Sequence, residues 1–168
     1  MRVLEQGGAP QGARVLVPGA GRGHDALAFA RAGCLAVAVD VSPSACTWMR
    51  ASARCAGLPL GVLEADVLAL PATFDGVFDL VWEQTCLCAL PPERRGDYVS
   101  VLRRVLKPQG RVLALLWNHG QPGGPPYDIT PALARSLFLG PFVELGLEPE
   151  PTSSVGRQNE FLLRLARA

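Results

Sequence analysis

Short apolar runs alternate with stretches of helical pattern along the chain. The runs cover residues 14–17, 34–39, 60–64, 77–82 and 111–117, and a last run over 160–165 predicts a closing strand. Their apolar residues are mostly continuous instead of alternating with polar ones. Continuous runs are typical of parallel strands that are covered on both faces.

The segments between the runs carry helix start and stop signals. Ser42 and Pro43 predict an N-cap and a first-turn proline. Helices are predicted after Gly23 to about Gly33, from Pro43 to Gly57, from Pro91 to Leu106 and from Pro131 to about Leu139. The alternation predicts an α/β fold, a doubly wound, Rossmann-like and mostly parallel sheet of seven strands or slightly fewer. With no repeat and no linker, residues 1–168 are expected to form a single domain.

Composition and charge exclude several classes of protein. The 168 residues are 49% hydrophobic and carry 16 basic and 15 acidic side chains, a net charge of +1. The basic residues are scattered, so no nucleic-acid partner is expected. No apolar run is long enough for a membrane span, and none near Met1 resembles a signal peptide, so we expect no membrane partner and a cytoplasmic location.

Five cysteines are present, an odd number that argues against a disulfide framework. The pair Cys86 and Cys88 lacks the spacing of a zinc site, and no second Cys/His pair lies nearby. We therefore expect no bound metal and interpret the cysteines as small buried side chains.

A glycine-rich loop follows the first strand and carries the first chemical signal. Gly19, Ala20, Gly21 and Gly23 lie between that strand and a predicted helix, where backbone N–H groups can approach a nucleotide cofactor. The dinucleotide fingerprint G-x-G-x-x-G requires glycine one residue later, where His24 stands. The loop reads G-x-G-x-G, the spacing seen in S-adenosylmethionine methyltransferases.

Acidic residues end the next strands. Asp40 is placed to accept hydrogen bonds from both ribose hydroxyls, with Val41 beside it. Asp66 is placed to accept from an adenine amino group, with Val67 packing nearby, and Glu83 ends the fourth strand. A glycine loop followed by acids on successive strands is more specific than either feature alone.

Longer motifs resemble one family of class I S-adenosylmethionine-dependent methyltransferases, the thiopurine and halide/thiol methyltransferases. Pro18–Asp25 is similar to that family's P-G-C-G-[KR]-G-x-D loop, and Val39–Ala45 to its G-x-D-x-S-x-x-A segment. Leu106–Gly110 matches L-K-P-x-G, and Gly123–Tyr127 matches its G-G-P-P-[FY] loop. A further similar stretch begins at Phe78.

The resemblance implies S-adenosyl-L-methionine as cofactor and a small-molecule acceptor, a thiol, a thiopurine or a soft anion. It implies cofactor contacts from the glycine loop and the acids above, and an acceptor pocket that involves Gln84, Thr85 and Tyr127 of the Gly123–Tyr127 loop. No catalytic acid or base is named, because the sulfonium is already activated and the protein mainly positions the reactants.

Two departures from the family and two alternatives remain. The family's N-terminal cover segment is expected to be missing, because the chain opens almost directly at the first strand, and Gln84 stands where relatives often carry Arg or Tyr. Without that cover, we expect a monomer or a homodimer. The alternatives are an NAD-dependent oxidoreductase, disfavoured by the position of Gly23 and by Asp66, and a non-catalytic cofactor-binding subunit.

Overall fold

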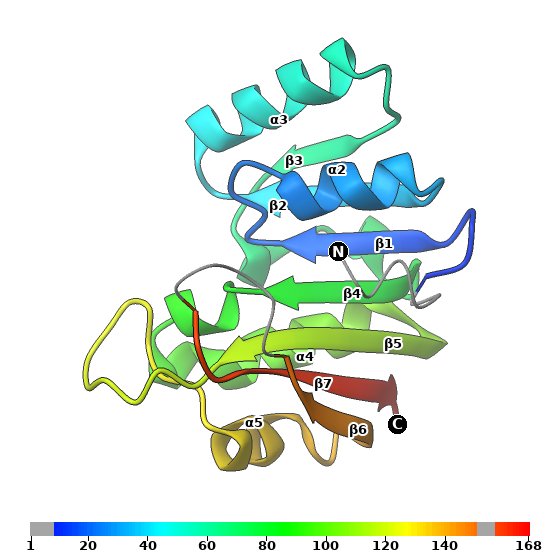
Figure 1. The fold of residues 1–168 in the computed structure, drawn as a ribbon. Helices are drawn as coiled ribbons and strands as arrows, with labels where there is room; N and C mark the ends of the chain where they lie inside the picture. Colours follow the sequence, from blue (N-terminus) through cyan, green and yellow to red (C-terminus); the bar gives the residue numbers. More distant parts are fainter. Residues whose placement is uncertain (1–8, 151–156) are drawn as a thin grey trace.

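The computed structural model describes residues 9–150 and 157–168, which form a seven-stranded sheet flanked by helices (Figure 1). The strands are β1 (Arg14–Pro18), β2 (Leu35–Asp40), β3 (Gly61–Glu64), β4 (Phe78–Gln84), β5 (Leu106–Trp117), β6 (Phe142–Pro149) and β7 (Glu160–Arg167). The α-helices are α2 (His24–Arg31), α3 (Pro43–Cys55), α4 (Arg95–Val105) and α5 (Pro131–Phe138). Short 3₁₀ turns are η1 (Val67–Ala69), η2 (Ala72–Phe74), η3 (Leu87–Ala89) and η4 (Pro92–Arg94).

The strand order is β3-β2-β1-β4-β5-β7-β6. Strands β1 to β5 pair in parallel, and β7 is antiparallel to both of its neighbours. The carboxyl ends of the parallel strands therefore share one edge with the first residues of β7. In open α/β sheets, ligands bind at that edge.

Both faces of the sheet are buried, as the continuous apolar runs predicted. On one face Leu16 and Val81 pack in a cluster with Tyr98 of α4 and Phe138 of α5. On the other face, Val15 packs in a second cluster. That cluster also contains Phe29 of α2, Met49 of α3 and Trp82 of β4. Alternate residues of each strand thus serve opposite layers.

The predicted helix cap at Ser42 is confirmed, and Thr130 caps α5 in the same way. The Ser42 hydroxyl accepts from Ala45 N (3.3 Å) and the Thr130 hydroxyl from Leu133 N (3.1 Å). One helix prediction started too early, because Pro92–Arg94 forms a separate 3₁₀ turn and α4 begins only at Arg95.

Two strand predictions need correction. The sequence pattern does not predict β6, although this strand pairs with β7 along most of its length. The pattern also predicts a helix end at residues 107–110 and the fifth strand after them, whereas β5 starts at Leu106. The register explains this, because Phe78 pairs with Leu106 and Leu80 with Arg111, so the intervening residues bulge from the ladder.

Other expectations are tested in part. All five cysteines are unpaired, and each is buried except Cys55. None of the helices in the described ranges combines the length and the apolar character that crossing a membrane demands. The expected absence of an N-terminal cover concerns residues 1–8, which lie outside the described ranges.

Candidate active site

The loop from Pro18 to Gly23 joins β1 to α2 at the carboxyl edge of the sheet. Gly19 has a φ of 59°, and a Cβ there would lie 2.9 Å from the Cys86 side chain, so a larger residue would clash. Gly21 has a φ of 54°, and a Cβ at this position would meet no heavy atom within 4 Å. Ala20 N donates to Val39 O (3.0 Å), so this amide is already bonded. The loop packs closely at Gly19 and leaves its backbone open at Gly21, as a bound ligand requires.

Asp40 at the end of β2 ties that loop to α3. Its Oδ2 accepts from Gly21 N (2.7 Å), and its Oδ1 accepts from Ser42 N (2.9 Å). An ionised carboxylate has about four lone-pair sites, so each oxygen keeps acceptor capacity. The side chain is partly exposed, and its neighbour Val41 is 73% exposed. Both side chains are therefore accessible from solvent at this edge of the sheet.

Asp66 and Val67 differ in what they offer at the end of β3. Asp66 is exposed, and its Oδ1 accepts from Leu68 N (2.8 Å), which caps η1. Val67 is only 8% exposed and packs in the core against the α4 side of the sheet. Asp66 is thus the member of this pair that faces solvent.

Glu83 lies differently from the other acids, and its interpretation as a cofactor ligand needs correction. The residue is fully buried. Its Oε1 accepts from Cys86 N (3.1 Å) and Leu87 N (2.9 Å), and its Oε2 accepts from the Tyr98 hydroxyl. Burial raises the pKa of the Glu83 carboxyl, and these hydrogen bonds oppose that shift. Glu83 therefore stabilises the β4–α4 loop by accepting hydrogen bonds from its backbone, and it does not face a cofactor.

Gln84 and Thr85, which the sequence predicts as acceptor contacts, follow Glu83 and line neither of the two hollows described below. Gln84 ends β4 and is partly exposed. Thr85 has a φ of 69°, which is unusual for a β-branched residue, and its hydroxyl donates to Gln84 O (2.6 Å). Such strained positions cost about 1–3 kcal/mol and cluster at functional sites. Glu83 supplies the hydrogen bonds that stabilise the turn containing Thr85.

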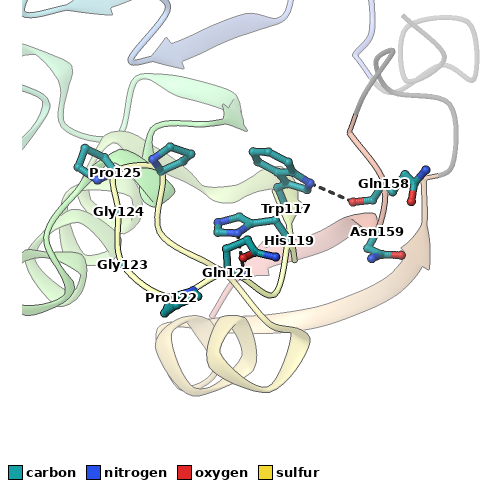
Figure 2. A pocket seen from close by; sticks show the side chains of 10 residues that line it. Trp117, His119, Gln121, Pro122, Gly123, Gly124, Pro125, Gln158 and Asn159 are labelled. Atoms are coloured by element: carbon teal, nitrogen blue, oxygen red, sulfur yellow. Dashed lines mark hydrogen bonds between the residues drawn. The ribbon is translucent and has the colours of Figure 1, made fainter.

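Trp117 at the end of β5 and the residues just before β7 border a cavity of about 550 Å³, a volume typical of small-molecule sites (Figure 2). It is lined by Trp117, His119, Gln121, Pro122, Gly123, Gly124, Pro125, Pro126, Gln158 and Asn159. The His119 ring packs 4.8 Å from the Trp117 ring, and its Nδ1 accepts from Gln121 N (3.1 Å). The neutral ring therefore carries its proton on Nε2, a buried atom that has no partner among the described residues.

Tyr127 joins the acceptor loop to the β4–α4 loop. Its backbone N donates to Cys88 O (2.7 Å), and the Arg95 guanidinium lies 5.1 Å from the centre of its ring. The ring lines a second hollow of about 490 Å³ beside the cavity of Figure 2, with Arg95 and Asp128. The structure thus brings the Thr85 and Tyr127 segments together, but the Tyr127 ring faces the neighbouring hollow.

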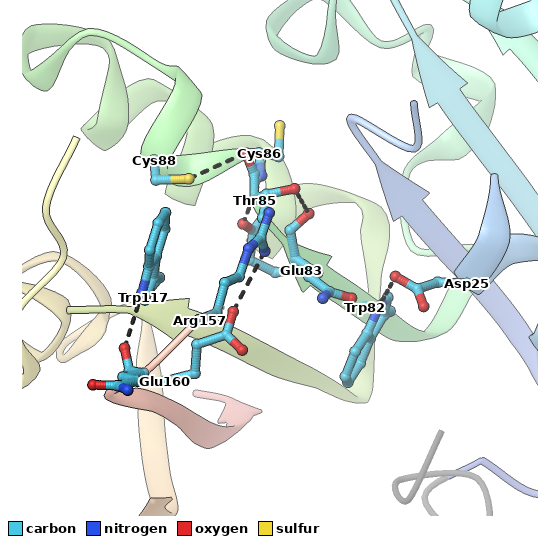
Figure 3. A network of polar contacts seen from close by, with 11 residues as sticks. Asp25, Trp82, Glu83, Thr85, Cys86, Cys88, Trp117, Arg157 and Glu160 are labelled. Atoms are coloured by element: carbon cyan, nitrogen blue, oxygen red, sulfur yellow. Dashed lines mark hydrogen bonds and ion pairs between the residues drawn. The ribbon is translucent and has the colours of Figure 1, made fainter. Parts of the chain in front are cut away.

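An ion pair between Arg157 and the buried Glu160 lies at the start of β7 and completes this edge (Figure 3). The sequence pattern predicts no role for it. Arg157 Nη1 lies 3.4 Å from Glu160 Oε1, and the Glu160 side chain has no exposed surface. The Arg157 guanidinium lies 5.2 Å from the centre of the Trp117 ring. Figure 3 shows Arg157 extending toward Thr85 and Cys86. An acidic residue directly before the apolar run 161–163 is the signal of this pair in the sequence.

The cysteines of this region are not poised as nucleophiles. Burial raises the pKa of the Cys88 thiol to about 11 and raises that of Cys86 well above its usual range. Both thiols are therefore protonated near neutral pH. No cluster of three or more possible metal ligands occurs among residues 9–150 and 157–168.

Residues 1–160 match the family model of thiopurine S-methyltransferase. The chain belongs to this family. Thiocyanate methyltransferase 1 of Brassica oleracea is 28% identical over 166 residues, covering 95% of this chain and 71% of that protein. Probable thiol methyltransferase 2 of Arabidopsis thaliana is 32% identical over 134 residues, and here the match covers 76% of this chain but only 57% of the relative. Family membership excludes the oxidoreductase alternative.

Solved structures agree on the fold. An S-adenosylmethionine-dependent methyltransferase from Methanosarcina mazei superposes with a TM-score of 0.85 at 16% sequence identity, covering 98% of this chain and 96% of that one. At that identity the likeness establishes the class I methyltransferase fold alone. Family and fold together identify a class I S-adenosylmethionine-dependent methyltransferase.

Proposed function

We propose that this chain catalyses methyl transfer from S-adenosylmethionine to a small nucleophile, a thiol, a thiopurine or a soft anion. The thiopurine S-methyltransferase family match supports the reaction, and the thiocyanate and thiol methyltransferases among the relatives support the class of acceptor. The cavity of about 550 Å³ bordered by Trp117 is large enough for such an acceptor.

One observation carries the cofactor assignment: Asp40 accepts from Gly21 N (2.7 Å) and still has free acceptor capacity at the carboxyl edge of the sheet. A ribose diol would bind this carboxylate, and the open backbone at Gly21 fits the close approach of the cofactor. We assign cofactor contacts to Gly19, Ala20, Gly21, Asp40, Val41, Asp66 and Val67. Glu83 is excluded from this set because both of its buried oxygens already accept hydrogen bonds from the protein.

The bound cofactor supplies an electrophilic methyl group on a sulfonium. The protein then has to align the acceptor for in-line attack and exclude water. We assign acceptor contacts to Gln84, which ends β4, to Thr85, which follows it, and to the loop of Tyr127.

Isothermal titration calorimetry tests the cofactor assignment. The protein is expected to bind S-adenosylhomocysteine and to show no binding of NAD at the same concentration. Release of S-adenosylhomocysteine is then measured over a panel of thiols, thiopurines, thiocyanate and halides, and at least one is expected to be methylated. Binding of NAD alone, or methylation of nucleic acid or protein only, would overturn the proposal.

We further propose one methyltransferase domain over residues 1–168, a cytoplasmic location and no nucleic-acid partner. The scattered basic residues and the odd, unpaired set of five cysteines support these assignments.

A further inference from the structure

Glu160 is a buried carboxylate for which the structure provides only part of its hydrogen bonding. Its side chain has no exposed surface, and Oε2 has no partner among the described residues. A buried polar atom without a partner costs about 1–3 kcal/mol, more when charged. Such atoms call for an explanation, which can be a catalytic role.

The surroundings of Glu160 place it at the proposed acceptor site. It pairs in register with Trp117 of β5, whose ring lines the cavity of about 550 Å³. The next residues back along the chain, Asn159 and Gln158, line the same cavity. Its partner Arg157 points toward Thr85, as Figure 3 shows. Glu160 therefore lies beside residues that line the cavity, and its partner Arg157 reaches toward the turn after β4.

The ion pair between Arg157 and the Glu160 carboxylate is weak. The Nη1–Oε1 distance of 3.4 Å exceeds the roughly 2.7–2.9 Å of a strong charge-assisted hydrogen bond. Arg157 is also a third exposed, with 33% of its side chain accessible. A ligand that displaces this guanidinium toward the Trp117 ring, 5.2 Å away, gains access to the carboxylate.

We propose that Glu160 is the base that takes the proton from a neutral thiol acceptor, which makes the preferred substrate a protic thiol instead of an aprotic anion. This inference rests on the proposed function. As the thiol sulfur attacks, the new S–CH₃ bond forms and the bond from that carbon to the sulfonium breaks, its electron pair passing to the cofactor sulfur. The thiol proton passes to Glu160 Oε2, and water later removes it.

The charges around Glu160 suit this role. Burial raises the pKa of the Glu160 carboxyl, Arg157 opposes the shift, and Glu150 adds to it. A carboxylate with a raised pKa is a stronger base. It also repels an anionic acceptor such as thiocyanate or a halide, which has no proton to lose.

The test compares acceptors with and without an ionisable S–H proton in the Glu160→Gln variant. We expect kcat/KM for an alkanethiol to fall about 10²- to 10⁴-fold, the range of general base catalysis. Activity on thiocyanate and on an arenethiol that is already ionised at the assay pH should not fall, and it should rise to the extent that the Glu160 charge repels these anions. Glu148→Gln is the matched control, because Glu148 is 62% exposed on β6 and pairs with Arg164.

Parallel losses on all acceptors, or no loss on the alkanethiol, would overturn the role of Glu160. If Glu160→Gln fails to fold, the wild-type protein still decides: a clear preference for the alkanethiol over thiocyanate supports the inference, and turnover of thiocyanate alone overturns it. A wild-type protein that methylates neither thiols nor anions refutes the proposed function itself.

Discussion

Asp40 and Glu83 are both carboxylates at strand ends, but their surroundings differ, and so do the roles we assign to them. Asp40 is partly exposed and bonded to two backbone amides of neighbouring loops. Glu83 is fully buried, with both oxygens occupied from the side of α4. The difference is one of direction, because successive side chains of a strand point to opposite faces.

The variant Asp40→Asn tests the proposed role of Asp40 in cofactor binding. The amide nitrogen that replaces one oxygen cannot accept from Gly21 N, and the charge that favours ribose hydroxyls is lost. Charge-assisted hydrogen bonds contribute about 1.5–3 kcal/mol, so affinity for S-adenosylhomocysteine should fall roughly ten- to hundred-fold in calorimetry. Asp97→Asn, on the exposed side of α4, should bind normally. A folded Asp40→Asn protein with wild-type affinity would make Asp40 purely structural.

Sequence alone placed the glycine loop and Asp40 correctly at one edge, because both follow directly from strand ends. It could not place Glu83, since the decisive partner is Tyr98, which comes from a helix fifteen residues later. It also assigned no role to Glu160, because the meaning of that residue depends on the register of β7 beside β5.

At the scale of the elements, the segment that connects β4 to α4 contains the turn with Thr85. We call this segment the β4–α4 joint. Glu83 accepts from the amides of Cys86 and Leu87 within the loop and from the Tyr98 hydroxyl on the helix. Cys86 in turn lies against Gly19, so the same joint supports the glycine loop. One buried carboxylate thus connects the acceptor side of the site with its cofactor side.

Tyr98→Phe should weaken this joint. The change leaves Glu83 Oε2 buried without a donor, at a cost of about 1–3 kcal/mol in the free energy of unfolding measured with urea. Without that donor the pKa of Glu83 rises further, because the Tyr98 hydrogen bond opposes the effect of burial. The deficit should therefore be largest at pH values above the pKa of Glu83, where the carboxyl is ionised, and shrink as pH falls and the carboxyl is protonated.

Tyr127→Phe is the control for this stability measurement, because Tyr127 is partly exposed and its known contacts use its backbone N and its ring. A Tyr98→Phe protein with wild-type stability at every pH would show that the hydroxyl does not support Glu83.

Element boundaries were harder to predict than element types. The motif Leu106–Gly110 combines proline and glycine, which usually end a strand or helix, yet the sheet accommodates it as a bulge in β5. Strand β6 escaped prediction because its apolar residues are spread around Gly146, where its register with β7 shifts.

At the scale of the whole molecule, the sheet has β3 and β6 as its two edges. Strand β6 exposes Val143 (55%) and Leu145 (53%) but also carries features that discourage edge pairing. These are the shift at Gly146, the closing Pro149, and charged side chains that pair with Arg135 and Arg164.

We therefore expect a monomer in light scattering, with and without S-adenosylhomocysteine. A homodimer would contradict this prediction. If the dimer were lost in Val143→Lys, the contact would lie at the β6 edge.

The position of β7 between β5 and β6 has a consequence for biosynthesis. During translation β6 emerges first, but its only neighbour in the sheet is the strand that follows it. Until β7 has left the ribosome and inserted beside β5, β6 has no strand with which to form hydrogen bonds. The apolar flank of β5 stays exposed during this time. The first five strands can pair as they appear, whereas this last closure waits for contacts that are distant in sequence, which slows folding. The incompletely folded chain would thus be most prone to aggregation just before β7 pairs with β5. A chaperone that shields the exposed flank of β5 would reduce aggregation most at this stage.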